Sequence, residues 1–134
     1  MSRIKLATHR MQKAKEIFIE ASDSIQQKHF GLSVTRSYYA MFSAARALLA
    51  LKEMDSSKHS GIISLFNQHI VKENLFPKEI GKFLPKAKDL REEADYGDFV
   101  EITGKDARIQ LERAQQFIEA AEKTLENLTR GASE

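Results

Sequence analysis

The sequence predicts an all-α fold, an up-and-down bundle of four long helices with short kinked segments between them. Only 6 Gly and 2 Pro occur among 134 residues, so few positions interrupt a helix. Apolar side chains also return every three or four residues along most of the chain, which gathers them on one helical face. We expect a single domain over residues 1–134, with frayed ends at residues 1–2 and 130–134.

The first two predicted helices should form an antiparallel hairpin. The first, from residue 3 to about 27, carries a seam of Ala7, Met11, Ala14, Phe18, Ala21 and Ile25. His29, Phe30 and Gly31 should break it, and Ser33 is a plausible N-cap for a second helix to about Lys52. The second helix contains no Gly or Pro, so we expect it to be continuous.

The later helices are marked by caps and prolines. Ser56 or Ser57 should cap a third helix that runs to about Glu73. Pro77 suits the first turn of a fourth segment, and Pro85 should end or kink it before helix resumes over residues 86–94. Thr103 and Asp106 have the spacing of a capping box and predict a last helix to about Thr129.

The second predicted helix has two faces suited to packing. Its bulky stripe should point into the core and consists of Val34, Tyr38, Met41, Phe42, Ala45, Leu48 and Leu49. The opposite row holds the small residues Ala40, Ser43, Ala47 and Ala50, beside Arg36, Tyr39 and Arg46. A row of small side chains lets another helix approach closely. We therefore expect a homodimer through the Ala40, Ser43 and Ala47 face, with both copies of Arg36 near one cleft.

Composition excludes several classes of protein. The absence of Cys excludes disulfides and thiolate chemistry, and no run of about 18 apolar residues predicts a membrane span. The same two absences lead us to expect a cytoplasmic protein. No two histidines stand at chelating spacing and no Gly-rich phosphate loop occurs, so we expect no metal and no cofactor. Residues 1–88 carry 15 Lys and Arg against 7 Asp and Glu, whereas residues 89–134 carry 6 against 12. This asymmetry fits complementary helices packing together or a basic surface for a phosphate-bearing partner.

Three segments resemble one known family. They are Arg-Ser-Tyr-Tyr-Ala-Met-Phe-Ser-Ala-Ala-Arg-Ala-Leu-Leu from Arg36, Ser-Lys-His-Ser-Gly from Ser57, and Arg-Glu-Glu-Ala-Asp-Tyr-Gly-Asp-Phe from Arg91. Together they resemble the HEPN superfamily (higher eukaryotes and prokaryotes nucleotide-binding), in its small single-domain prokaryotic branch. The resemblance implies a helical domain that handles nucleotide or RNA between two subunits. It also implies pairing with a minimal nucleotidyltransferase in a toxin–antitoxin-type pair.

The resemblance also implies a catalytic pattern, an Arg followed after four to six residues by a His, for metal-independent RNA cleavage. Here Arg36 is followed after six residues by Ser43, so serine occupies the position of the family His. A serine hydroxyl does not act as a base near neutral pH without a neighbour that takes its own proton. Arg36 then remains either a phosphate ligand or a structural ion-pair partner.

His59 and Lys58 open the third predicted helix, where free backbone N–H groups and the helix dipole favour a phosphate. The alternative is that the flanking serines cap the helix while His59 packs. With Arg36, Tyr39 and Arg46, these two residues form the expected phosphate site, and His59 could replace the missing base near Arg36. Three functions stay open: phosphate binding, a weak ribonuclease using Arg36 and His59, or a purely structural interaction partner.

The third resembling segment should have mainly structural roles. Arg91 and Asp95 are one helical turn apart and should form an ion pair. Tyr96 and Asp98 should belong to a turn that follows.

Overall fold

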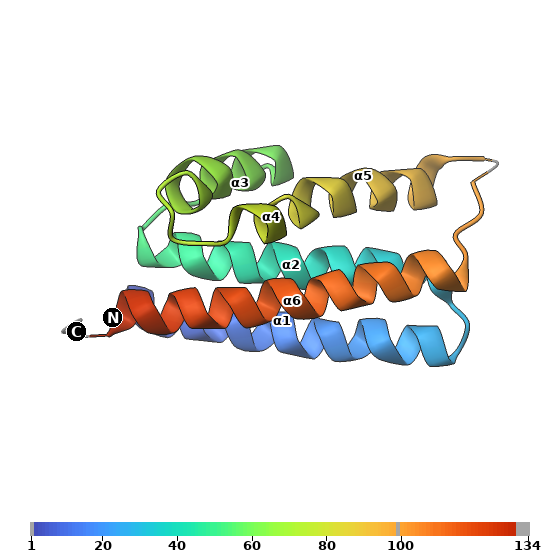
Figure 1. Ribbon diagram of the computed structural model, residues 1–134, viewed down its shortest axis with the longest axis horizontal. Coiled ribbons are helices and arrows are strands. Elements are labelled where there is room, and N and C mark those ends of the chain that lie inside the picture. Colours follow the sequence, from blue (N-terminus) through green and yellow to red (C-terminus); the bar gives the residue numbers. More distant parts are fainter. Residues whose placement is uncertain (1, 99, 131–134) are drawn as a thin grey trace.

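The computed structural model describes residues 2–98 and 100–130, and over these residues it is all-α, as predicted. Three long helices form one part of the bundle and pack each against the other two: α1 (Arg3–Gln26), α2 (Phe30–Leu51) and α6 (Gly104–Thr129). A second layer covers them with α3 (His59–Phe66), the π-helical turn η1 (Asn67–Val71), α4 (Lys78–Gly81) and α5 (Phe83–Tyr96) (Figure 1). Of the predicted frayed ends, residues 1 and 131–134 lie outside the described residues.

The α1–α2 hairpin forms, but its turn lies earlier than predicted. Lys28 has a φ of 62°, the left-handed region that closes helix ends, and the N–H of His29 donates to the Ser24 carbonyl at 2.8 Å. Gly31 and Ser33 therefore lie inside α2, and His29 is its N-cap. The predicted cap at Ser33 is wrong: this residue is buried, and its hydroxyl donates to the Ala21 carbonyl across the hairpin at 2.8 Å.

The second layer is broken by the two prolines. Pro77 directly precedes α4, and Pro85 is in the first turn of α5, where its missing N–H is not needed. A proline ring clashes with the carbonyl four residues earlier. The predicted break is present, but it lies at Lys82, before Pro85, and α5 begins at Phe83 instead of residue 86. Ser56 does not cap α3: its hydroxyl accepts a hydrogen bond from the N–H of Lys58, which is the N-cap residue.

The predicted capping box of α6 is confirmed. The N–H of Asp106 donates to the Thr103 hydroxyl at 3.1 Å, and the N–H of Thr103 donates to the Asp106 carboxylate at 3.0 Å. These bonds satisfy N–H groups that the first turn of a helix otherwise leaves free. From this start α6 packs along α2 and α1 and joins the two layers.

The core is centred on α2. Its predicted stripe is buried, including Tyr38, Met41, Leu48 and Leu49 with no exposed surface, and only Phe42 is partly exposed. Three phenylalanine rings from the two layers, Phe66, Phe76 and Phe117, lie 4.9 to 5.5 Å apart between centroids. A separate small cluster at the end of the bundle that holds both chain ends joins Ala7, Ala50 and Leu51 to Ile4, Leu125 and Leu128 (Figure 1).

The row of small residues on α2 faces α1 of the same chain. Ala40 and Ala47 have 0% exposed surface, and the Ser43 hydroxyl donates to the Arg10 carbonyl of α1 at 2.8 Å. Small side chains do permit the predicted close helix approach, but the approaching helix is α1. The face predicted for the homodimer, Ala40, Ser43 and Ala47, is therefore wrong, because this surface is already buried within one chain. The homodimer itself stays a prediction.

Candidate functional site

His59, the first residue of α3, lies among aromatic side chains of α2. Its Nδ1 forms a hydrogen bond of 2.9 Å with the Tyr38 hydroxyl. The His59 ring stacks on Phe42 with centroids 4.3 Å apart and planes 28° apart, and it meets Tyr39 edge to face at 5.7 Å. Arg91 of α5 completes this group, which we call the His59 cluster.

The helical spacing of α2 explains why these side chains meet. Tyr38 and Phe42 are one turn apart, so both lie on the flank of α2 that α3 and α5 cover. Arg91 reaches the same flank, with its guanidinium carbon 5.4 Å from the ring centroid of Tyr39 and 5.9 Å from that of Tyr38. The Arg91 Nε lies 3.1 Å from Asp95 Oδ2, which confirms the predicted ion pair within α5.

The surroundings of His59 favour its neutral form. Partial burial lowers the pKa of His59, and the positive charges of Arg91, Lys88 and Arg46 lower it further. At pH 7 the imidazole is therefore uncharged and one of its ring nitrogens can accept a proton. Burial raises the pKa of Tyr38, so its hydroxyl keeps its proton and stays available for the bond to His59.

Beside the cluster lies a hollow of about 550 Å³, which we call the His59 hollow. Its lining comes from the end of α2, the following connection and the start of α3, and consists of Phe42, Arg46, Asp55, Ser56, Ser57, Lys58 and His59. The charged side chains in this lining are Arg46, Lys58 and Asp55.

Asp55 ties the connection between α2 and α3 to two arginines. Its carboxylate accepts hydrogen bonds from Arg46 at 3.1 and 3.3 Å, and Arg10 of α1 lies at 3.6 Å. Desolvation raises the pKa of Asp55, but the Ser56 N–H and the two arginines outweigh this effect and hold it below its ordinary value. Arg46 therefore lines the hollow with a guanidinium whose positive charge is partly offset by Asp55.

The structure brings four of the six predicted site residues together. His59, Lys58 and Arg46 line one hollow, and Tyr39 contacts the His59 ring. Arg36 and Ser43 do not line it. Arg36 Nε lies 3.6 Å from Glu20 Oε1 of α1, and Ser43 is bonded to the α1 backbone. His59 thus has Arg46 and Arg91 as its cationic neighbours instead of Arg36.

Sequence reasoning did not assign Tyr38, Phe42 and Arg91 to the site. The two rings were expected in the core stripe, and Arg91 was expected to have a structural role. The available signal was three aromatic residues within five positions of one helix. Tyr96 is 75% exposed at the end of α5, and Phe99, the last residue of that resembling segment, lies outside the described residues.

Two general features bear on the type of site. Over residues 2–98 and 100–130, no three His, Asp or Glu side chains lie close enough to hold a metal ion. Within the same residues, no helix has the length and apolar character needed to cross a membrane.

Comparison with known proteins identifies the family. The HEPN domain model matches residues 7–125. A UPF0332 protein of Thermotoga maritima is 33% identical over 126 residues, covering 94% of this chain and 96% of that protein. A Methanocaldococcus jannaschii protein named "Putative toxin" is 30% identical over 135 residues, covering 98% and 92%. A matched span of this length, supported by relatives aligned over nearly their full length, shows that the chain belongs to the HEPN domain family.

Proposed function

We propose that this toxin-like HEPN protein binds the phosphate of RNA or of a nucleotide in the His59 hollow. The supporting observation is the placement of His59, Lys58 and Arg46 on the lining of one hollow at the start of α3. Helix starts present free N–H groups and a partial positive charge, which suit an anion. The ammonium of Lys58 and the guanidinium of Arg46 add full charges beside them.

The two cations differ in what an incoming phosphate must displace. Over the described residues, no ion pair joins Lys58 to an acidic side chain, whereas Arg46 is already bonded to Asp55. A phosphate would therefore contact Lys58 without losing a protein bond, but it would compete with Asp55 for Arg46. Binding should be modest and should weaken as salt rises, as expected where phosphate contacts dominate affinity.

Cleavage of bound RNA is a second candidate function, favoured by the state of His59. For this role the ring proton would stand on Nδ1 and donate to the Tyr38 hydroxyl oxygen, which leaves Nε2 of the neutral imidazole free to accept a proton. It would take the proton of a ribose 2′-hydroxyl, whose oxygen would attack phosphorus and form a 2′,3′-cyclic phosphate. The bond from phosphorus to the 5′ oxygen would break, and this oxygen would leave as a hydroxyl after taking a proton from water. Arg46 and Lys58 would stabilise the charge that develops on the phosphate. In this proposal His59 replaces the family base at Ser43.

A protein partner is also part of the proposal. The Methanocaldococcus jannaschii relatives named "Putative toxin" support a toxin–antitoxin-type pair for this chain. The family resemblance described above makes a minimal nucleotidyltransferase the expected second member. Gel filtration of this chain mixed with such an enzyme should show a stable complex. Two separate peaks would remove the partner from the proposal.

Binding is tested with a labelled single-stranded RNA of about 12 nucleotides and with a labelled mononucleotide at low salt. Lys58→Gln should weaken binding about tenfold or more, whereas Arg36→Gln should leave it unchanged because Arg36 does not line the hollow. Arg36→Gln is a matched control since it also removes one cation, at a residue that lies beside Glu20 and outside the hollow. Loss of binding in Arg36→Gln alone would instead place the phosphate at Arg36.

Cleavage is tested in EDTA with the same RNA and a mass spectrometric readout of the products. His59→Gln should abolish cleavage but retain RNA binding, and Arg36→Gln should retain both. Cleavage that survives in His59→Gln would exclude His59 as the base. Binding without any cleavage by the wild-type chain would leave phosphate binding as the function.

A further inference from the structure

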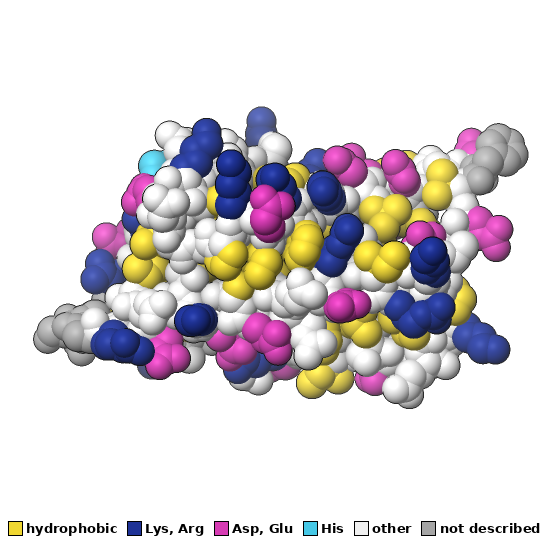
Figure 2. Space-filling view, viewed as in Figure 1, with side chains coloured by type: hydrophobic (Ala, Val, Ile, Leu, Met, Phe, Trp, Pro, Cys, Tyr) yellow, Lys and Arg dark blue, Asp and Glu magenta, His cyan; other side chains and the backbone are white. Residues whose placement is uncertain are grey.

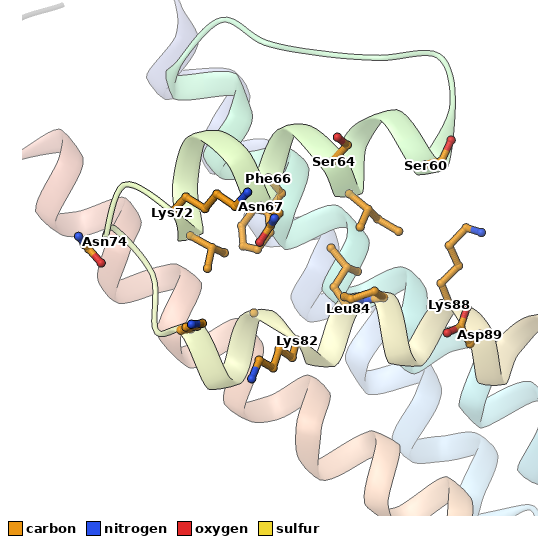
Figure 3. Close-up of a pocket in the computed structure, with 15 residues that line it drawn as sticks. Ser60, Ser64, Phe66, Asn67, Lys72, Asn74, Lys82, Leu84, Lys88 and Asp89 are labelled. Carbon is orange, nitrogen blue, oxygen red and sulfur yellow. The ribbon is translucent and has the colours of Figure 1, made fainter.

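A second, larger hollow lies between α3–η1 and α4–α5 (Figure 3). It measures about 720 Å³, and we call it the lysine groove. Its floor is apolar and is formed by Ile63, Phe66, Val71, Leu84 and Pro85. Four lysines, Lys72, Lys78, Lys82 and Lys88, stand around it, with Asp89 as the one acidic residue of its lining among the described residues.

We propose that the lysine groove binds an acidic amphipathic helix of a partner protein. The groove runs between two helical walls, an arrangement that accepts the apolar face of a third helix. Apolar side chains three, four and seven residues apart would then meet the floor. Glu and Asp beside them would meet the rim lysines. This inference goes beyond the proposed function and does not depend on it.

The charges of the rim support an acidic partner. Over residues 2–98 and 100–130, no ion pair joins Lys72 or Lys78 to an acidic side chain, and both lysines are exposed. Lys82 pairs with Glu79, and Lys88 pairs with Glu92. Figure 2 shows Lys and Arg side chains gathered over α3 and α4, with acidic side chains among them and apolar side chains beside them. Carboxylates of a docked helix would therefore meet two cations that have no competing protein carboxylate.

The backbone of one wall supports a dedicated site. Asn67 and Val71, which line the groove, lie in the π-helical turn η1. Single π-helical turns are rare and occur frequently at functional sites. At the opposite wall Gly81 is buried, and a Cβ placed there would lie 2.9 Å from Val71 Cγ2. The two walls therefore meet closely at this point, which fixes one end of the groove.

The floor argues against nucleic acid as the occupant. Single-stranded RNA is commonly held by exposed aromatic rings on which its bases stack. Among the described residues of the lining, Phe66 is the one aromatic residue; it is 2% exposed and packs against Phe76 and Phe117. The accessible apolar surface comes instead from aliphatic side chains such as Ile63 and Pro85, which suit the Leu or Ile of a peptide.

The test is selection of a displayed library of 16-residue peptides on the wild-type chain. Enriched peptides should carry apolar residues at helical spacing and a net negative charge. Lys72→Glu with Lys78→Glu should weaken their binding about tenfold or more. The matched control, Lys13→Glu with Lys123→Glu, changes the same charge at exposed residues on α1 and α6 and should leave binding unchanged.

A steric variant separates shape from charge. Ser64→Arg places a bulky side chain on the exposed wall of the groove and adds positive charge, so it should block the selected peptides despite its favourable charge. Thermal unfolding of each variant checks that the fold is retained. The proposal is overturned if no peptide is enriched, or if all variants bind the enriched peptides as well as the wild-type chain does. It is also overturned when a 16-nucleotide RNA or a second copy of the chain occupies the groove in place of the peptides.

Discussion

Ala47→Leu tests whether the small-residue row of α2 packs inside one chain. Ala47 has 0% exposed surface, so the added isopropyl group of leucine must be accommodated between α2 and α1. Overpacking of this kind costs about 1–3 kcal/mol. For a domain of this size each kcal/mol lowers the melting temperature by about 4 °C, so the expected loss is roughly 4–12 °C.

The assay is thermal unfolding by circular dichroism at two protein concentrations, about 5 and 200 μM (roughly the range over which a weak dimer would change population). If the row is an interface within the chain, the loss is the same at both concentrations. Gln116→Leu is the control, because it adds leucine at an exposed position of α6 and should change the melting temperature little. A loss that disappears at one concentration, or an oligomer that Ala47→Leu dissociates, would refute the packing described above.

Four further outcomes are expected. The pKa of His59 in the folded protein lies below the unfolded value of about 6.5, so neutral His59 stabilises the fold above that pH and this contribution is lost as pH falls below it. The urea midpoints of the wild-type chain at pH 7.5 and pH 5.5 should therefore differ more than those of His59→Gln. Tyr38→Phe removes the hydrogen bond to His59 and should cost about 1 kcal/mol in urea unfolding, and an unchanged midpoint would contradict that bond. Thr103→Ala removes the α6 cap and should cost about 1 kcal/mol, with faster amide exchange in the first turn of α6 as the local readout. Ser43→His should lower the melting temperature without conferring RNA cleavage, because the Ser43 side chain faces the backbone of α1.

The sequence was sufficient for much of the fold because the strongest signals are local. The capping box at Thr103 and the break caused by Pro85 depend on backbone chemistry within one turn. The capping box is found where expected, and the break lies at Lys82, one turn before Pro85. The hairpin turn was placed too late because Lys28, with a side chain that rarely adopts a positive φ, takes the position expected of glycine. The π-helical turn at residues 67–71 has no local sequence signal and was expected as ordinary helix.

The site was only partly predictable because it depends on which helix covers which face. His59, Lys58 and Arg46 were found from residue type and position, and the structure places them around one hollow. Helical periodicity put Arg36 beside Ser43, but it could not show that α1 would cover that face. Predicting contacts between distant segments, such as that of Tyr38 with His59, requires knowing which helices pack against one another.

The small cluster of Ile4, Leu125 and Leu128 against Ala7, Ala50 and Leu51 is separate from the main core. A bundle end sealed by its own few contacts opens more easily than the centre, because opening it leaves the main core intact. Amide exchange should therefore be faster in the first turn of α1 and the last turn of α6 than in the middle of these helices. Tags or deletions at either chain terminus should loosen this end first, while the rings around His59 stay in place.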